Sequence, residues 1–285
     1  MPTANETVVD ELIEMRGLRF HYRDWPCRAE QRSGGAPTLV LLHGYTGHAR
    51  SWDAFAAAMT DRYRVIALDQ RGHGETAWAP AGAYGIDDMT DDLTAFVAAL
   101  GLTGFTLLGL SMGGMVAMEY AGRRPPELAA VVIVDIAPEL VSSGAGRIRD
   151  GAKASDIFAS RDAAFAAARA ANPRPPEAHH RHRVDHSLMR LEEGTWTWRY
   201  DRALREVSAL RPRDAATAWR SCEAITVPTL LIRGAESDLL SPEIAARMAR
   251  TIPGAAFAEV AGAGHSVPLD APEGFLAAAR GFLRG

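Results

Sequence analysis

Short apolar runs alternate with alanine-rich, helix-forming stretches along this chain. Five of the runs are almost wholly apolar, which is typical of strands buried on both faces of a sheet; they are Thr38–Leu42, Arg64–Leu68, Phe105–Leu108, Val131–Val134 and Thr229–Ile232. Gly17–Trp25 alternates between polar and apolar positions, so we predict an edge strand there. Ala255–Val260 is a weaker candidate for the last strand.

Helices are predicted between these strands, at Ser51–Met59, Asp88–Leu100, Ser111–Arg123, Pro242–Thr251 and Pro272–Leu283. Asp270, three residues before Glu273, predicts a capping box at the start of the last helix. Alternation of buried strands and helices predicts an α/β fold, in which helices cover both faces of a mostly parallel sheet.

The alternation stops between about Pro138 and Pro212. This stretch contains a helix-forming run, Arg161–Ala171, and a proline-rich break, but no apolar run of the buried-strand type. Insertions in such sheets usually cover the carboxyl edge, where ligands bind. We therefore predict a mostly helical cap at 138–212, and a core formed by 1–137 and 213–285.

Composition excludes several classes of protein. The 285 residues are 47% hydrophobic and 23% charged, which argues against disorder, and the net charge of −4 gives no reason to expect nucleic-acid binding. Cys27 and Cys222 form no metal-ligand spacing and are predicted to be free thiols. No apolar run approaches the roughly 18 residues of a membrane span, and Met1–Met15 lacks the pattern of a secretory signal. We expect a soluble cytoplasmic protein; its oligomeric state cannot be predicted.

The strongest chemical motif is Gly109-Leu110-Ser111-Met112-Gly113, directly between the strand at Phe105–Leu108 and a predicted helix. A serine on a sharp strand-to-helix turn presents its hydroxyl as a nucleophile. The crowding of that turn requires very small residues two positions before and two positions after the serine, and both are glycine here. The helix that follows directs the positive end of its dipole at a developing anion. Ser111 is therefore the predicted nucleophile.

A second motif, His43-Gly44-Tyr45, ends the strand at Thr38–Leu42. Glycine lets the backbone turn back over the nucleophile, so the backbone N–H groups of Tyr45 and Met112 are predicted to form an oxyanion hole. His43 is predicted to be a structural hydrogen-bonding residue behind this loop.

His265, in Gly262-Ala263-Gly264-His265, follows the final predicted strand. A glycine-flanked loop at the carboxyl end of a strand can deliver an imidazole to the serine hydroxyl, so we predict that His265 is the general base.

Together with the strand order and Asp69-Gln70-Arg71-Gly72-His73-Gly74, these motifs resemble the α/β-hydrolase superfamily over nearly the whole chain. The resemblance implies an eight-stranded, mostly parallel sheet with a helical cap inserted after strand six. It also implies that Arg71–Gly74 is structural, and that neither a cofactor nor a metal is needed.

The acid that would orient His265 has two candidates. Most of the superfamily places it after the seventh strand in a Gly-x-x-Asp segment, but here Ser237 holds that position and Asp238 comes one residue late. Asp135 ends the strand at Val131–Val134, where some esterases and dehalogenases of the superfamily carry the acid. A carboxylate that closes a buried strand needs a partner. We favour Asp135 and keep Asp238 as the alternative.

The predicted function is a serine hydrolase that uses water to cleave a small ester, thioester or lactone through an acyl-enzyme on Ser111. Amide or carbon–carbon bond hydrolysis by the same residues is an alternative, as is a slow or non-hydrolysing receptor on the same fold. An aspartyl nucleophile is excluded because Ser111 occupies the turn, and no dinucleotide-binding glycine motif follows the first strands.

Two further features have more than one interpretation. Four histidines could suggest a metal site, but the arginines between them oppose a cation, so we predict a solvated cap segment; the histidines are His179, His180, His182 and His186. The side chains of Trp196, Trp198 and Tyr200 alternate with Thr195, Thr197 and Arg199. They either pack the cap on the core or line an acyl pocket, and the sequence leaves both open.

Overall fold

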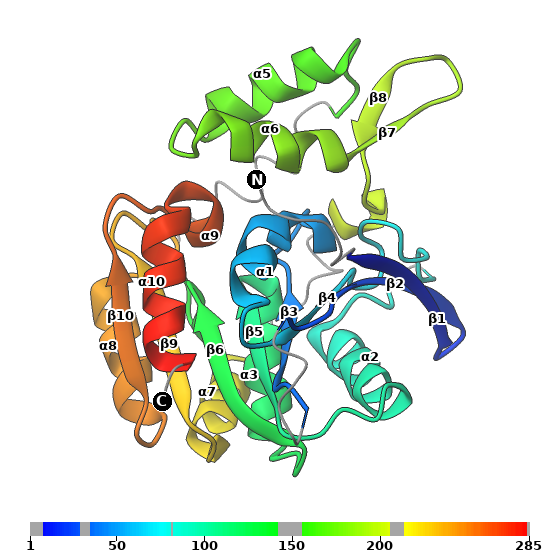
Figure 1. Ribbon diagram of the computed structural model, residues 1–285. Coiled ribbons are helices and arrows are strands. Elements are labelled where there is room, and N and C mark those ends of the chain that lie inside the picture. The colour runs from blue at the N-terminus through cyan, green and yellow to red at the C-terminus, as the bar shows by residue number, and fades with distance from the viewer. Residues whose placement is uncertain (1–7, 29–34, 81, 142–155, 206–213, 284–285) are drawn as a thin grey trace.

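An eight-stranded sheet forms the centre of the molecule, in the order β1-β2-β4-β3-β5-β6-β9-β10 (Figure 1). The computed structural model describes residues 8–28, 35–80, 82–141, 156–205 and 214–283. The first two strands pair antiparallel, β2 pairs antiparallel with β4, and the remaining neighbours pair parallel. The strands are β1 (Val9–Met15), β2 (Leu18–Trp25), β3 (Thr38–Leu42), β4 (Arg64–Leu68), β5 (Phe105–Leu110), β6 (Leu128–Val134), β9 (Thr229–Gly234) and β10 (Ala256–Val260). This arrangement confirms the predicted fold class.

The central strands are apolar on both faces because a core lies on each side of the sheet. In β3, Val40 and Leu42 face one hydrophobic cluster, while Leu39 and Leu41 face the other. All four are completely buried. The wholly apolar sequence of these runs follows from this two-sided burial.

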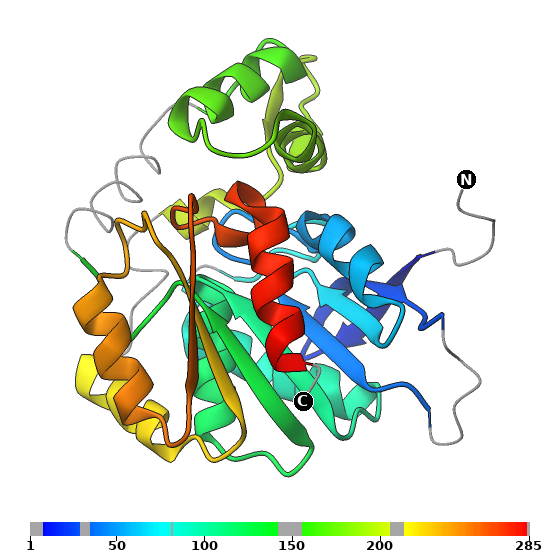
Figure 2. The ribbon, with the colours of Figure 1, turned by 60° about the vertical axis from the view of Figure 1, so that its left-hand side comes forward.

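Helices cover the two faces separately. One face packs against α2 (Ile86–Ala99), α3 (Met112–Gly122), α7 (Ala215–Ala224) and α8 (Pro242–Thr251). The other packs against η1 (Ala49–Trp52), α1 (Asp53–Met59) and α10 (Pro272–Leu283). Figure 2 shows α8 and α10 on opposite sides of β9 and β10.

The strand predicted at Gly17–Trp25 is present as β2, but the prediction that it forms the edge of the sheet is wrong. A strand absent from our sequence prediction, β1, pairs along the whole of β2 and forms the edge itself. Most of β1 is exposed and three of its seven residues are acidic, so it lacks the apolar run that marks the central strands.

The described part of the segment between β6 and α7 lies over the carboxyl ends of the parallel strands (Figure 1). Its described part contains α5 (Arg161–Ala171), α6 (Glu177–His186), a hairpin of β7 (Leu188–Arg190) with β8 (Trp196–Trp198), and η2 (Arg202–Arg205). Of the predicted cap, 142–155 and 206–213 lie outside the described residues. Backbone hydrogen bonds join this inserted segment to the loop after β4, from Gly74 N to Arg199 O (3.1 Å) and from Asp201 N to Gly72 O (2.8 Å).

The predicted capping box at the last helix is wrong. Asp270 ends a separate short helix, α9 (Val267–Asp270). Its two carboxylate oxygens accept hydrogen bonds from Asn172 Nδ2 (2.7 Å) and Gly264 N (2.9 Å). The carboxylate therefore binds a backbone N–H of the loop that carries His265, and it does not cap the amino end of α10.

Candidate active site

Ser111 lies on a tight turn between β5 and α3. Its backbone has φ 53° and ψ −115°, a strained conformation for a residue with a side chain. The two flanking glycines permit the turn: a Cβ on Gly109 would lie 2.1 Å from Gly113 O, and a Cβ on Gly113 would lie 2.5 Å from Leu42 O. The turn therefore needs glycine at both positions, and it holds the Ser111 side chain at the carboxyl edge of the sheet.

His265 reaches Ser111 from the loop between β10 and α9. Its Nε2 lies 2.9 Å from Ser111 Oγ, across 154 positions of sequence. Its Nδ1 lies 2.8 Å from Asp135 Oδ2. A carboxylate oxygen only accepts, so Nδ1 donates to Asp135, which leaves Nε2 free to accept the Ser111 proton.

Asp135, rather than Asp238, is the carboxylate beside His265. Asp135 follows β6, has a positive φ of 50° and is fully buried. Besides His265, its oxygens accept from Gly234 N (2.9 Å) and Ser237 Oγ (2.5 Å). The buried Asp135 carboxyl group therefore accepts three hydrogen bonds. Asp238 is exposed on the surface.

The loop after β3 lies against the nucleophile. A Cβ added to Gly44 would lie 3.2 Å from Ser111 Cβ, which is a tight contact, so glycine favours this close approach of the backbone. Behind the loop, His43 Nδ1 donates to Gly44 O (2.8 Å) and His43 Nε2 accepts from Gln70 N (3.0 Å). Burial lowers the pKa of His43, so the ring is neutral and holds the loop by hydrogen bonds. The oxyanion-hole role of the Tyr45 and Met112 amides stays a prediction.

A family model described as the alpha/beta hydrolase fold matches residues 37–272. The chain belongs to the α/β-hydrolase fold family. With this match, the resemblance predicted from its motifs is confirmed.

Relatives of the chain are named as hydrolases of several bonds. It is 30% identical over 263 residues to an esterase of Mycobacterium tuberculosis, covering 88% of this chain and 84% of the relative. It is also 30% identical over 282 residues to the N-formylmaleamate deformylase of Pseudomonas putida, covering 95% of both. A solved α/β hydrolase from Novosphingobium aromaticivorans superposes with a TM-score of 0.86 and 27% identity, covering 99% of both chains. The chain is a hydrolase of the α/β fold.

The sequence analysis did not predict that Ser237 and Asp270 support the active site of this hydrolase. Ser237, in the position usual for the acid, donates to Asp135 and accepts from Leu239 N and Leu240 N (both 3.2 Å). Asp270 holds Gly264 N, directly before His265, and burial raises the pKa of its carboxyl group. Ser237 could have been found from its place in the Gly-x-x-Asp segment; Asp270 left no signal in the sequence.

The run Asp69–Gly74 is built into the core of the hydrolase. Asp69 accepts from Ala49 N (2.5 Å), His21 Nδ1 (2.7 Å) and Glu75 N (2.9 Å). Arg71 forms a two-bond ion pair with Asp92, at 2.5 and 2.6 Å. These contacts are structural and include neither Ser111 nor His265.

The histidines of α6 serve helix packing and an ion pair. His182 Nε2 lies 3.0 Å from Asp53 Oδ2, His186 Nδ1 lies 2.8 Å from His182 O, and His180 is buried against the ring of Phe165. Within the described residues, no group of three or more potential ligands is placed to hold a metal ion. The same part of the chain contains no helix long and apolar enough to cross a bilayer.

The aromatic residues of β8 and the turn after it connect the inserted segment to the core. Trp196 packs within the inserted segment, Trp198 packs against both that segment and the main cluster, and Tyr200 is buried in the main cluster. The Tyr200 ring lies 5.9 Å from that of Tyr45, which follows Gly44. These contacts belong to packing of the inserted segment on the core.

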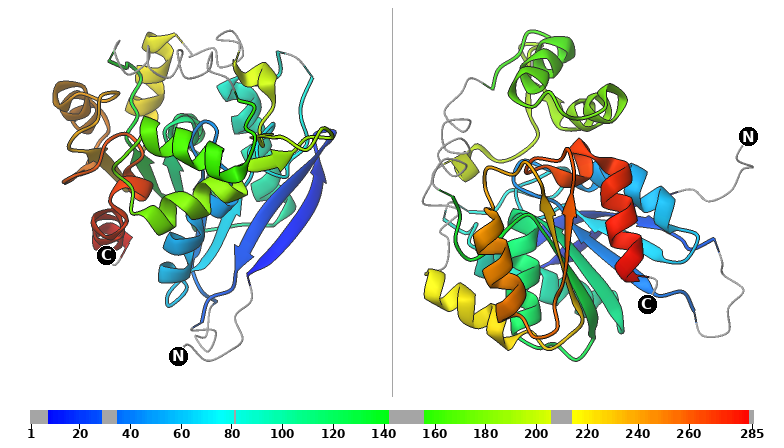
Figure 3. Two further views of the ribbon diagram at one scale, coloured as in Figure 1. Left: turned by 90° about the horizontal axis from the view of Figure 1, so that it is seen from above. Right: turned by 90° about the vertical axis from the view of Figure 1, so that its left-hand side faces the viewer.

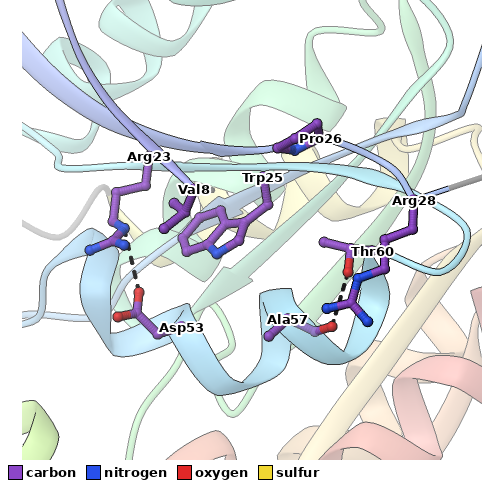
Figure 4. A pocket seen from close by; sticks show the side chains of 8 residues that line it. All are labelled: Val8, Arg23, Trp25, Pro26, Arg28, Asp53, Ala57 and Thr60. Atoms are coloured by element: carbon purple, nitrogen blue, oxygen red, sulfur yellow. Dashed lines mark hydrogen bonds and ion pairs between the residues drawn. The ribbon is translucent and has the colours of Figure 1, made fainter. Parts of the chain in front are cut away.

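A separate pocket of about 290 Å³ opens between β2 and α1 (Figure 4). Arg23 lies over the Trp25 ring there, and its Nε is 3.5 Å from Asp53 Oδ1. None of the lining residues belongs to the Ser111 site.

Proposed function

We propose that this protein is a serine hydrolase that cleaves a small carboxylic ester, thioester or lactone through an acyl-enzyme on Ser111. One observation carries the proposal: Ser111 Oγ, the His265 ring and the Asp135 carboxylate form a continuous hydrogen-bonded chain of 2.9 and 2.8 Å. Such a chain is the arrangement that activates a serine hydroxyl.

The first half of the reaction forms the acyl-enzyme. Ser111 Oγ adds to the substrate carbonyl carbon while His265 Nε2 takes the hydroxyl proton. The carbonyl oxygen becomes an oxyanion, which accepts hydrogen bonds from the backbone N–H groups of Tyr45 and Met112. The bond to the alcohol then breaks, and the same proton passes from His265 to the leaving oxygen. Asp135 stabilises the transient imidazolium without taking its proton.

Water completes the cycle. A water molecule gives a proton to His265 Nε2 and its oxygen adds to the acyl carbon. The tetrahedral intermediate collapses, His265 returns the proton to Ser111 Oγ, and a carboxylic acid leaves. His265 gives back each proton that it takes, so the reaction is complete without a cofactor or a metal.

Residues 138–212 are proposed to form the cap that covers this site, and 1–137 with 213–285 the core. The described part of the cap supports this role, because it lies above the loops that carry Gly44 and Gly72. A cover here would exclude water from the oxyanion and limit the size of the acyl group.

A fluorophosphonate probe tests the nucleophile. The Ser111 oxygen displaces fluoride and keeps the phosphorus, so mass spectrometry of the folded protein should find one adduct on the peptide that contains Ser111. The Ser111→Ala variant should carry no such adduct. A folded wild-type protein that stays unlabelled would remove the serine-hydrolase proposal and leave the receptor alternative.

A substrate panel then separates the bonds. p-Nitrophenyl esters of increasing acyl length, thioesters, lactones and amides are compared, each against Ser111→Ala. Amide hydrolysis is the second candidate, because a relative 30% identical over 95% of this chain is named as a deformylase. Faster turnover of amides than of every ester would replace the ester proposal by this one.

A further inference from the structure

The α6 helix places an arginine above the loop that follows β3. The backbone oxygen of Arg183 lies 3.1 Å from His48 Nε2, and the same nitrogen lies 2.9 Å from Ser187 Oγ. Seen from above, α6 crosses the middle of the sheet (Figure 3, left). In the same turn of α6, His182 Nε2 lies 3.0 Å from Asp53 Oδ2, at the start of α1. Two anchors therefore hold α6 over the carboxyl edge, where Ser111 lies.

Among the described residues, the guanidinium of Arg183 has no hydrogen-bonding or ion-pair partner, although Arg183 is half-buried. Neighbouring arginines of the inserted segment are paired: Arg174 with Glu236 (3.0 Å) and Arg181 with Asp162 (2.5 Å). A partly buried cation without a paired anion costs free energy, which an anionic ligand would recover.

The surroundings of Arg183 place its charge beside the Ser111 site. Burial is the main cause that lowers the pKa of His43 and of His48, and the charge of Arg183 adds to it. Burial also lowers the pKa of Arg183 itself, and the negative charge of Asp270 partly offsets this effect. His43 precedes Gly44, which touches Ser111, while Asp270 holds the amide directly before His265. Arg183 therefore approaches the loop after β3 through its backbone contact with His48, and its charge acts on Asp270, beside the loop that carries His265.

Asp270 does not neutralise this cation directly. Its oxygens accept from Asn172 Nδ2 and Gly264 N, and it lies beyond ion-pair distance of Arg183. Burial lowers the pKa of the Arg183 guanidinium, yet arginine stays charged at neutral pH because its usual value is so high. The charge and the five N–H donors of the guanidinium are therefore available to an anionic ligand.

We propose that Arg183 binds a second carboxylate on the substrate, so that the preferred substrate is an anionic ester or amide rather than a neutral one. The carboxylate belongs either to the acyl part or to the leaving group; in both cases it is distinct from the scissile carbonyl. A guanidinium fork matches a carboxylate by two parallel hydrogen bonds. The proposal rests on Ser111 being the nucleophile and names the substrate class of that site.

Matched substrates test it. The monomethyl esters of succinate, glutarate and adipate are each compared with the neutral methyl ester of the same acyl length, and O-butyrylglycolate with ethyl butyrate, by titrating released acid. We expect kcat/KM to favour the anionic member of at least one pair. Arg183→Met should lower that preference about 10- to 100-fold, mainly through KM, while Arg183→Lys keeps part of it. Arg181→Met removes a neighbouring arginine that is already paired with Asp162, so it should leave the preference as in the wild type.

The outcomes separate this proposal from the one it rests on. Ser111-dependent hydrolysis with no preference for any anionic member, or equal loss for both members in Arg183→Met, would overturn the arginine proposal alone. If no ester is hydrolysed, calorimetry with adipate and succinate measures binding directly in the wild type and in Arg183→Met. Binding that Arg183→Met loses would support the carboxylate site in a receptor, whereas the absence of binding would refute it. Thermal unfolding of each variant shows that it folds.

Discussion

Replacing Asp135 by asparagine changes one oxygen of the site into an NH₂ group at unchanged size. The two oxygens of Asp135 accept three hydrogen bonds, from Gly234 N, Ser237 Oγ and His265 Nδ1. In either orientation, the asparagine NH₂ group faces a donor that the carboxylate satisfied. If it faces His265, the ring must put its proton on Nε2, where it can no longer accept from Ser111.

The size of the effect follows from this loss of the base. A wrong imidazole tautomer in a serine hydrolase costs about 10⁴-fold in kcat, or about 5.5 kcal/mol at 1.36 kcal/mol per tenfold. Asp238→Asn is the matched control, because that carboxyl group is exposed. We expect it to change kcat by less than about threefold.

Both variants are assayed by steady-state hydrolysis of the best p-nitrophenyl ester of the panel, with circular dichroism to show that they fold. The reasoning is refuted if Asp238→Asn loses more activity than Asp135→Asn. It is also refuted if a folded Asp135→Asn protein keeps more than about a tenth of the wild-type kcat.

Three other predictions concern residues around the site and the core. Ser237→Ala removes a hydroxyl donor from Asp135 (2.5 Å), so kcat should fall about tenfold with KM nearly unchanged; an unchanged kcat in steady-state assays would contradict this support role. Gly109→Ala would force a Cβ to 2.1 Å from a backbone oxygen, so the free energy of unfolding in urea should fall by about 3–5 kcal/mol. Gly281→Ala has open space around the new Cβ and should stabilise the last helix by up to about 1 kcal/mol. Equal effects of the two variants would argue against the crowded turn. Burial would raise the pKa of Asp69, but the hydrogen bond from His21 and nearby charges outweigh it and lower that pKa to about 2, below the usual 3.8. The folded state therefore favours the ionised carboxylate, and this contribution of about 2 kcal/mol is complete above pH 4 and lost as the pH falls toward 2. Urea unfolding of Asp69→Asn between pH 5 and pH 2.5 should lack this part of the pH dependence, and a slope equal to that of the wild type would count against it.

Features encoded over a few adjacent residues could be predicted from the sequence. The strands buried on both faces are marked by their apolar runs, since each of their faces meets a core. The turn at Ser111 is marked by the two glycines that its crowding requires. The edge strand β1 escaped prediction because an exposed strand carries no such run.

The choice of partners for these residues depended on the tertiary structure. Two carboxylates one strand apart in the sheet were both compatible with the sequence, and only the path of the loop after β9 brought Ser237 to Asp135 while leaving Asp238 outside. The hydrogen bond from Asn172 to Asp270 and the contact of His48 with the backbone oxygen of Arg183 likewise join segments far apart in the chain. Burial and crowding act on neighbours in sequence and leave a local pattern. Hydrogen bonds and charges between distant segments depend on atomic positions that only the packed chain defines.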